Sequence, residues 1–299
     1  MEVVSAKYVI IDGNNLAFRC FYGVKQLSNN QKLPVNAIYG FVNSIFALEQ
    51  TVKYQHLIVC FDCSRSERRL GLLKEYKANR SATPEEFKVQ IPYIKKIIPL
   101  LGGFCYEKKG VEADDLIGSL CQKTSSVNEK TVIVSADKDL MQCVNTVVSQ
   151  LIPSNQGWNL LDRLGVFNKM QVYPEQIVDF LALMGDTADN YPGIQGVGPK
   201  TAAKWLAIYG TLDHLLTQIN SITPERFKTV LSESKDLLNK NKALAKLDCN
   251  PIYAEEILLG CSNCKKDYPT LTNLLEQLGL PKLANKFKKH FTTKQIELF

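Results

Sequence analysis

The sequence predicts an α/β protein with a mostly parallel central sheet flanked by helices, followed by a smaller α-helical C-terminal domain. In the first half of the chain, short β-branched runs alternate with stretches of helical spacing, which is typical of a parallel sheet covered on both faces. After about residue 165, strand patterns become rare and helical patterns dominate. The 299 residues are 45% hydrophobic and 22% charged, which suits two domains with a sizeable core and excludes a disordered chain.

Four short apolar runs are expected to form the parallel strands, at 8–12, 57–62, 104–107 and 132–136. Apolar residues three and four positions apart predict a helix over 37–51. A charged insertion at about 64–102 separates the second and third strands, and its composition alone is that of a solvated helix pair. We place the domain boundary at 170, which gives an α/β domain at 1–170 and a helical domain at 171–299.

Cysteine usage and apolar runs bear on the compartment. The nine cysteines lie mostly in apolar surroundings, which indicates reduced thiols. Cys261 and Cys264 have the spacing of a metal or redox motif, but no second pair follows them. The start of the chain lacks a secretory pattern, and the apolar runs are too short to span a bilayer. We therefore expect a cytoplasmic protein with no membrane partner.

Nine carboxylates lie at the predicted strand ends, at a helix start after the third strand, or in the segment GDTADN. They are Asp12, Asp62, Glu112, Asp114, Asp115, Asp137, Asp139, Asp186 and Asp189. Any one of them could be a helix cap or part of a polar loop. The carboxyl ends of parallel strands meet at one edge of a sheet, so we expect the set to gather in one crevice.

Such a crevice needs cations, because the carboxylates would otherwise repel each other by on the order of several kcal/mol. With only three histidines in the chain, at 56, 214 and 290, a zinc site is not indicated. Two or more Mg²⁺ or Mn²⁺ ions in an acidic pocket are typical of phosphodiester cleavage. Setting these nine aside leaves 36 basic against 21 acidic residues, an excess of 15 that suits a polyanionic substrate.

The acidic segment runs directly into the glycine-rich stretch GIQGVGPKT at 193–201. Pro199 separates Gly198 from Lys200, and no apolar strand precedes the stretch, so it does not match a nucleoside-triphosphate loop. It fits a hairpin between two helices better, with the backbone N–H groups of Gly196 and Gly198 at the start of a helix near Pro199. Such a hairpin would hold duplex phosphates without reading sequence, and Lys204 would extend the contact.

Six motifs occur in order along nearly the whole chain: IIDGNNLAFR, a strand ending in CFD, EYKANR, GVEADDLIGSL, SADKDL and GDTADNYPGIQGVGPKTA. In this respect the sequence resembles the 5′-nuclease family, in its bacterial and phage 5′→3′ exonuclease and flap endonuclease branch. The N-terminal nuclease domain of DNA polymerase I is of the same kind. The resemblance implies a PIN-like nuclease domain, a helical arch over about 64–102 and a helix–turn–helix-type hairpin at 193–201.

The resemblance also implies roles for particular residues. All nine carboxylates match the metal-binding acids of the family. Lys77 and Arg80 would neutralise the scissile phosphate, Tyr76 would stack on a base, and Arg19 would contact a phosphate. The implied duplex contacts come from the hairpin, where relatives also hold a K⁺ ion: Gly196, Gly198, Lys200, Thr201 and Lys204.

Two positions depart from the pattern, since Arg68 stands where relatives tend to have an aromatic residue and Phe18 replaces a common tyrosine. The implied function is a Mg²⁺- or Mn²⁺-dependent 5′→3′ exonuclease and 5′-flap endonuclease in replication and repair. Its implied substrate is DNA with a 5′ end or flap, RNA-primed DNA included. We expect a free-standing monomer that works alongside a DNA polymerase. The alternatives are a non-catalytic DNA-structure-binding protein of the same fold and a metal-dependent RNA nuclease.

Overall fold

A six-stranded sheet forms the centre of the computed structural model, which describes residues 4–154 and 157–296, with only the backbone for 291–296. The spatial order of the strands is β5-β4-β2-β6-β7-β8. All neighbours are parallel except β7 and β8, which form an antiparallel edge. The strands are β2 (Tyr8–Asp12), β4 (His56–Phe61), β5 (Gly103–Glu107), β6 (Thr131–Val134), β7 (Val148–Ser154) and β8 (Gly157–Leu161).

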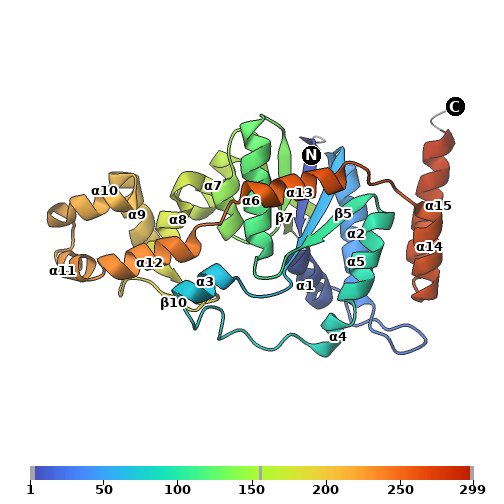
Figure 1. Cartoon of the computed structure of the whole chain (residues 1–299), viewed down its shortest axis with the longest axis horizontal. Helices are drawn as coiled ribbons and strands as arrows, with labels where there is room; N and C mark the ends of the chain where they lie inside the picture. The colour runs from blue at the N-terminus through green and yellow to red at the C-terminus, as the bar shows by residue number, and fades with distance from the viewer. Residues whose placement is uncertain (1–3, 155–156, 297–299) are drawn as a thin grey trace.

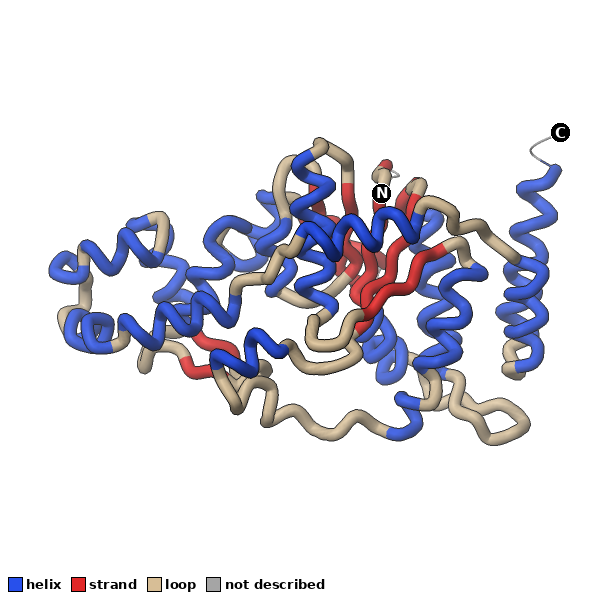
Figure 2. The backbone as a smooth tube through the Cα atoms, in the orientation of Figure 1, coloured by secondary structure: helices blue, strands red, loops and turns tan. Residues whose placement is uncertain are grey.

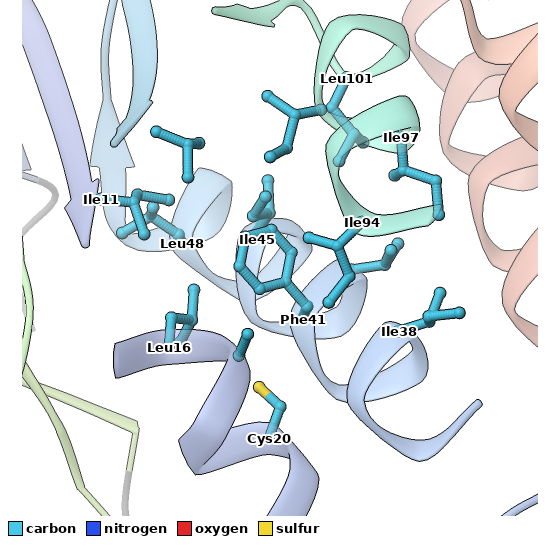
Figure 3. Close-up of a cluster of buried hydrophobic side chains, with 14 of the residues drawn as sticks. Ile11, Leu16, Cys20, Ile38, Phe41, Ile45, Leu48, Ile94, Ile97 and Leu101 are labelled. Atoms are coloured by element: carbon cyan, nitrogen blue, oxygen red, sulfur yellow. The ribbon is translucent and has the colours of Figure 1, made fainter. Parts of the chain in front are cut away.

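Helices cover both faces of the sheet, and alternate residues of β2 show how. Val9 and Ile11 belong to the core under α1 (Gly13–Gly23), α2 (Asn36–Thr51) and α5 (Ile91–Leu100). Ile10 belongs to the opposite core, under α6 (Ala113–Ser126). Because both faces are covered, each inner strand is a continuous apolar run rather than an alternating one. Figure 3 shows the first core, where Phe41 and Ile45 of α2 lie between Leu16 of α1 and Ile94 of α5.

The segment between β4 and α5 is helical only near its ends. It contains α3 (Glu67–Leu72) and α4 (Glu85–Lys88), and residues 73–84 between them are turns and irregular chain. Figure 2 shows this connection as a long loop along one side of the molecule. Phe18 of α1 stacks on Phe87 of α4 with the ring centroids 4.0 Å apart, which fastens the far end of the segment. The expected helical arch is therefore two short helices joined by an irregular strap at 73–84.

A helical region follows the sheet and lies at one end of the molecule's longest axis (Figure 1). Its core contains Phe180, Trp205, Leu206, Leu231 and Leu238. Its elements are η1 (Asp139–Cys143), α7 (Arg163–Met170), η2 (Pro174–Gln176), α8 (Ile177–Met184), β9 (Gly185–Asp186), β10 (Tyr191–Pro192), α9 (Pro199–Tyr209), α10 (Leu212–Thr217), η3 (Ile219–Ser221), α11 (Arg226–Glu233) and α12 (Lys235–Ala245).

The last three helices leave this region and return to the α/β layers. They are α13 (Pro251–Cys261), α14 (Tyr268–Gln277) and α15 (Pro281–Ile296). Ala254 and Ile257 of α13 share a core with Ile10 of β2. Leu271 and Phe287, from α14 and α15, share the core of α2 and α5 at the opposite end of the molecule from α9–α12.

The predicted fold class is confirmed. All four expected parallel strands are present: the first has the expected bounds, and the ends of the other three differ by at most two residues. The β7–β8 edge was not predicted, nor was the short parallel pair β1 (Val4–Ser5) and β3 (Val52–Lys53). The division at residue 170 stays a prediction, but 251–296 packs with the α/β layers rather than with the helical region. The outermost residues of both predicted domains, 1–3 and 297–299, lie outside the described residues.

Candidate active site

Three neighbouring parallel strands end at the same edge of the sheet, and a carboxylate follows each. Asp12 is the last residue of β2, Asp62 directly follows β4, and Asp137 comes three residues after β6. A cleft of about 960 Å³ opens at this edge. Five of the predicted acids line it: Asp12, Asp62, Glu112, Asp114 and Asp137.

The folded chain holds two of these carboxylates in fixed positions. Asp12 accepts hydrogen bonds from the backbone N–H of Asn15 at 3.0 Å and from the Ser135 hydroxyl at 3.0 Å. Asp62 accepts a 2.7 Å bond from the N–H of Ala113, the first residue of α6. Each acid thus uses an otherwise unpaired N–H at a helix start, so its direction is set before any ligand binds.

The carboxylates repel one another as the sequence predicts. Burial, together with the charges on Asp62 and Asp137, raises the pKa of Asp12 from 3.8 to about 7. Burial raises the pKa of Asp114 well above its ordinary value, and the charges on Asp137 and Asp12 add to this. These acids are therefore held at a free-energy cost that a bound cation would relieve.

Basic side chains line the same cleft. They are Arg19, Arg65, Lys77, Arg80 and Lys88. Lys77 is buried beside the carboxylates: its Nζ lies 3.0 Å from Glu112 Oε1 and 4.0 Å from Asp189 Oδ1. Burial lowers the pKa of Lys77, but the charges on Glu112 and Asp189 outweigh this and raise it, so the ammonium stays charged.

The motif EYKANR and the loop at 187–190 interlock at the base of the strap. The Lys77 N–H donates to the Asp189 carbonyl at 3.1 Å, and Asn190 Nδ2 donates to the Glu75 carbonyl at 2.7 Å. Arg80 Nη2 donates to Asp189 Oδ1 at 2.8 Å. Lys77 and Asn190 both adopt left-handed backbone conformations, at φ 53° and 61°. Two motifs separated by more than a hundred residues therefore form one surface beside the cleft.

Two glycines allow the helical region to place Asp186 and Asp189 near the cleft. β9 and β10 form a two-stranded antiparallel hairpin that carries Asp186 and presents Asp189 in its turn. A Cβ on Gly193 would lie 2.0 Å from the Met184 carbonyl carbon, and a Cβ on Gly185, at φ 71°, would lie 2.1 Å from the Gly193 nitrogen. Only glycine permits this approach of two backbones, which returns the chain after α8 toward the cleft.

The carboxylates of this hairpin are paired with cations rather than open to the cleft. Asp186 Oδ2 lies 2.8 Å from Lys138 Nζ, and Asp189 is paired with Arg80. Asp139 lies nearby: burial raises its pKa well above the ordinary value, and the charges on Asp137, Asp189 and Asp186 add to this. Asp139 Oδ1 is a buried oxygen with no hydrogen-bond partner in the described part of the chain. A carboxylate oxygen without a hydrogen-bond partner, close to other carboxylates, is the kind of ligand that a hard divalent cation binds.

The nine acids thus come from the α/β layers and from the helical region and lie near one another, but they do not all line the cleft. Asp115, Asp139, Asp186 and Asp189 do not line the cleft. Within residues 4–154 and 157–296, no group of three or more His, Cys, Asp or Glu side chains is arranged to hold a metal ion as it stands. Several of the carboxylates are paired with cations of the chain instead: Asp115 with Arg69, Glu112 with Lys77, and Asp186 with Lys138.

Tyr76 does not present its ring for stacking on a base. Its side chain is buried, with an exposed fraction of 1%. The hydroxyl lies 3.2 Å from Glu112 Oε2 and 2.9 Å from Asp189 Oδ2, and it donates toward these two oxygens. Tyr76 therefore connects the two lobes from behind the cleft. The motif EYKANR did not indicate that Tyr76 is buried, because a tyrosine among charged residues is expected to be exposed.

The glycine-rich segment forms the expected helix start. Gly198 is the N-cap of α9 and Pro199 its first residue, with no side chain capping the helix. Gly196, at φ 79°, is exposed, as are Lys200 and Lys204, whereas Thr201 is half-buried. The segment lies outside the cleft, adjoining the hairpin that carries Asp186. A helix start that no side chain caps, with two ammonium groups beside it, suits phosphate groups.

Several residues of the site were not predicted from the sequence. Arg65 and Lys88 line the cleft, Ser135 fixes Asp12, and Lys138 pairs with Asp186. Lys138 could have been noticed because it lies between two candidate ligands in SADKDL. Arg69, which bonds to Glu112 and Asp115, gave no signal within its run of charges. The pair Cys261 and Cys264 consists of free thiols and joins no metal group among the described residues.

A mostly parallel sheet with carboxylates in a cleft at its carboxyl edge, lined also by Lys77 and Arg80 of the strap, suits a metal-dependent enzyme that cleaves phosphodiesters. Residues 7–171 match the family described as "5'-3' exonuclease, N-terminal resolvase-like domain", and residues 172–257 match "5'-3' exonuclease, C-terminal SAM fold". The chain belongs to the 5′-3′ exonuclease family and is a nuclease.

Relatives with assigned names agree. The chain is 37% identical over 286 residues to the 5′-3′ exonuclease of Aquifex aeolicus, covering 94% of this chain and 95% of that protein. It is 36% identical over 241 residues to DNA polymerase I of Bacillus subtilis, covering 80% of this chain but only 27% of the polymerase. The chain thus spans about a quarter of this polymerase relative.

Solved structures show the same fold. The bacteriophage T5 flap endonuclease, in a pseudo-enzyme-product complex with DNA and metal ions, aligns with a TM-score of 0.66 at 24% identity, over 93% of this chain and 99% of that one. The catalytic core of Rad2 in complex with DNA substrate aligns with a TM-score of 0.62 at 14% identity, over 96% and 91%. At these identities the likeness supports the fold alone. No helix in the described part of the chain is long and apolar enough to cross a membrane.

Proposed function

We propose that this nuclease is a Mg²⁺- or Mn²⁺-dependent 5′→3′ exonuclease and 5′-flap endonuclease acting on branched or nicked DNA. The observation that carries the proposal is a single cleft lined both by carboxylates and by arginine and lysine side chains. Such a cleft can bind metal ions and a phosphodiester backbone at the same time. The match to the 5′-3′ exonuclease family and the identity to the Aquifex aeolicus 5′-3′ exonuclease support the polarity and the reaction.

The residues present fit divalent cations. We propose that the five lining carboxylates hold one ion, and that Asp139, Asp186 and Asp189 serve a second once Lys138 and Arg80 release them. Asp115 is bound by Arg69 and would act behind the ligands rather than as one of them. When bound, the ions would lower the pKa of the attacking water and stabilise the leaving oxygen.

The chain's own groups would orient the phosphate. Lys77 is buried beside the carboxylates, so its ammonium would meet the scissile phosphate where little water competes. Arg80 is half-exposed in the same cleft and would bind a phosphate oxygen in place of Asp189. Arg19, exposed on α1, lines the cleft too and would contact a phosphate.

We propose that Gly196, Gly198, Lys200, Thr201 and Lys204 hold the duplex beside the cut. The exposed start of α9 supports this, because no side chain caps it and a helix N-terminus favours phosphate oxygens. A K⁺ ion on backbone carbonyls of this turn stays a prediction. So do action as a monomer, removal of RNA-primed ends, and partnership with a DNA polymerase. The DNA polymerase I relatives favour that partnership.

The decisive experiment is cleavage of a 5′-flap DNA carrying a label at either end, first with Mg²⁺ and then with EDTA. We expect Mg²⁺-dependent cuts near the flap junction, with product lengths that give 5′→3′ polarity and products that end in a 5′-phosphate. A blunt duplex without a 5′ flap serves as the structural control. Cutting that persists in EDTA, or that starts from the 3′ end, would overturn the proposal.

A further inference from the structure

Arg69 is the most deeply buried cation of the site, with an exposed fraction of 3%. Its guanidinium donates to both oxygens of Asp115, at 2.7 Å and 2.8 Å, and to Glu112 Oε2 at 3.0 Å. Its Nε donates to the carbonyl of Leu244 at 3.0 Å, so the side chain also reaches α12. Three elements, α3, α6 and α12, therefore meet at one side chain that does not line the cleft.

We infer that Arg69 is a positioning residue that holds Glu112 in the orientation which the metal site needs. This inference rests on the proposed metal site and adds to it a residue that touches neither substrate nor metal. Glu112 lies at the start of α6 and lines the cleft, while Asp115 lies one turn further along the same helix face. The bidentate bond to Asp115 fixes the Arg69 guanidinium in place, and the fixed guanidinium in turn holds Glu112.

The contacts of Asp115 show why this side chain is fixed. Asp115 Oδ1 also accepts a 2.9 Å bond from the Asp248 N–H, so Asp115 cannot rotate without losing contacts to two segments. Glu112 Oε2 is shared by Arg69 and the Tyr76 hydroxyl, which leaves Oε1 directed at Lys77. A planar guanidinium can bridge two carboxylates in this way, whereas a lysine ammonium is a point charge that cannot match both.

The neighbouring residue provides a matched control. Arg68 also comes from α3 and also donates to the end of α12, to the Ala243 carbonyl at 2.8 Å and the Lys246 carbonyl at 2.7 Å. Neither of these two bonds goes to a carboxylate. Removing Arg68 therefore loosens the attachment of α3 to α12 and leaves the Glu112 contact intact. Comparing the two arginines separates attachment of the helices from positioning of the ligand.

The experiment measures metal binding without turnover. Mn²⁺ affinity of the DNA-free full chain is measured by isothermal titration calorimetry for the wild type, Arg69→Lys and Arg68→Ala. We expect Arg69→Lys to weaken Mn²⁺ binding by about 10-fold or more, the usual effect of losing a group that orients a metal ligand. The Mg²⁺ concentration for half-maximal flap cleavage should rise to a similar extent. Flap binding in EDTA should stay within about twofold, and so should the Mn²⁺ affinity of Arg68→Ala.

A second variant guards against misfolding. The double variant Arg69→Met with Asp115→Leu removes the buried pair without leaving an unpaired charge, and the same loss of Mn²⁺ affinity is expected. Wild-type Mn²⁺ affinity in Arg69→Lys, or equal weakening by Arg68→Ala, would overturn the positioning role alone. Absence of Mn²⁺ binding by the wild type would instead refute the proposed metal site, on which this inference depends.

Discussion

Replacing Lys77 by alanine tests most directly whether the basic side chains of the cleft neutralise the scissile phosphate. The side chain is buried, and its ammonium lies 3.0 Å from Glu112 Oε1. In the free protein it neutralises carboxylates, and in the proposed reaction it neutralises the phosphate. Because Glu112 keeps its bonds to Arg69 and Tyr76, the variant should fold. The change therefore removes one positive charge from the cleft and leaves the framework in place.

The size of the effect follows from what changes between the bound substrate and the transition state. A charge pair at 3.0 Å with an effective dielectric constant near 20 is worth about 5 kcal/mol. Most of this attraction exists before the reaction and does not speed it, since only interactions that strengthen in the transition state do so. Loss of one such stabilising group typically costs about 3–4 kcal/mol. We therefore expect Lys77→Ala to cut about 10²–10³-fold more slowly.

The assay is single-turnover cleavage of a labelled 5′ flap at saturating Mg²⁺, with flap affinity measured separately by fluorescence anisotropy in EDTA. Flap affinity should change by less than about threefold, since one phosphate contact among several contributes little. Lys74→Ala is the control, because Lys74 is exposed in the same segment and lines no part of the cleft. Equal losses of affinity and rate in Lys77→Ala, or a rate near that of the control, would refute the role in the chemical step.

Two further predictions concern stability. Gly193→Ala should lower the free energy of unfolding by about 3 kcal/mol, because its Cβ would lie 2.0 Å from backbone. Gly71→Ala, where a Cβ meets nothing within 4 Å, is the control in the same urea titration, and equal stability of the two variants would contradict the argument. Folding raises the pKa of Asp12 from 3.8 to about 7, so the metal-free folded state binds the extra proton and loses stability as pH rises through this window. The melting temperature in EDTA should therefore fall from pH 5 to pH 7.5 more steeply in the wild type than in Asp12→Asn. Added Mg²⁺ should raise it more at the higher pH, and parallel curves for the two proteins would refute the assignment.

The sequence predicted those parts of the fold that depend on local pattern. The inner strands were found because two covered faces make them apolar throughout. β7 was missed because it contains Pro153 and the polar Gln150, a buried residue whose amide donates to the carbonyls of Ser135 and Asp137. Its polarity is satisfied by the loop that follows β6, which no local pattern shows. The same holds for α13, whose apolar residues indicate burial but not the partner.

The candidate site was predictable as a set of residues but not as an arrangement. Strand ends placed Asp12, Asp62 and Asp137 together, because the topology of a parallel sheet fixes where its strands end. The positions of Lys77 and Arg69 could not be predicted in this way. Each lies among carboxylates contributed by other segments, and only the folded chain shows which cation meets which acid. From the charge composition of their segment alone, Lys77 and Arg69 would be expected to be exposed.

The return of α14 and α15 to the α/β layers has a consequence for how the protein is made. Leu271 and Phe287 complete a core to which α2 and α5, both within the first hundred residues, contribute Phe41 and Ile94. During synthesis on the ribosome, the apolar surface of α2 and α5 must wait uncovered until almost the entire chain has emerged. A nascent chain halted near residue 257 would carry both matched family segments yet expose that surface to water, which makes it a target for chaperones and proteases.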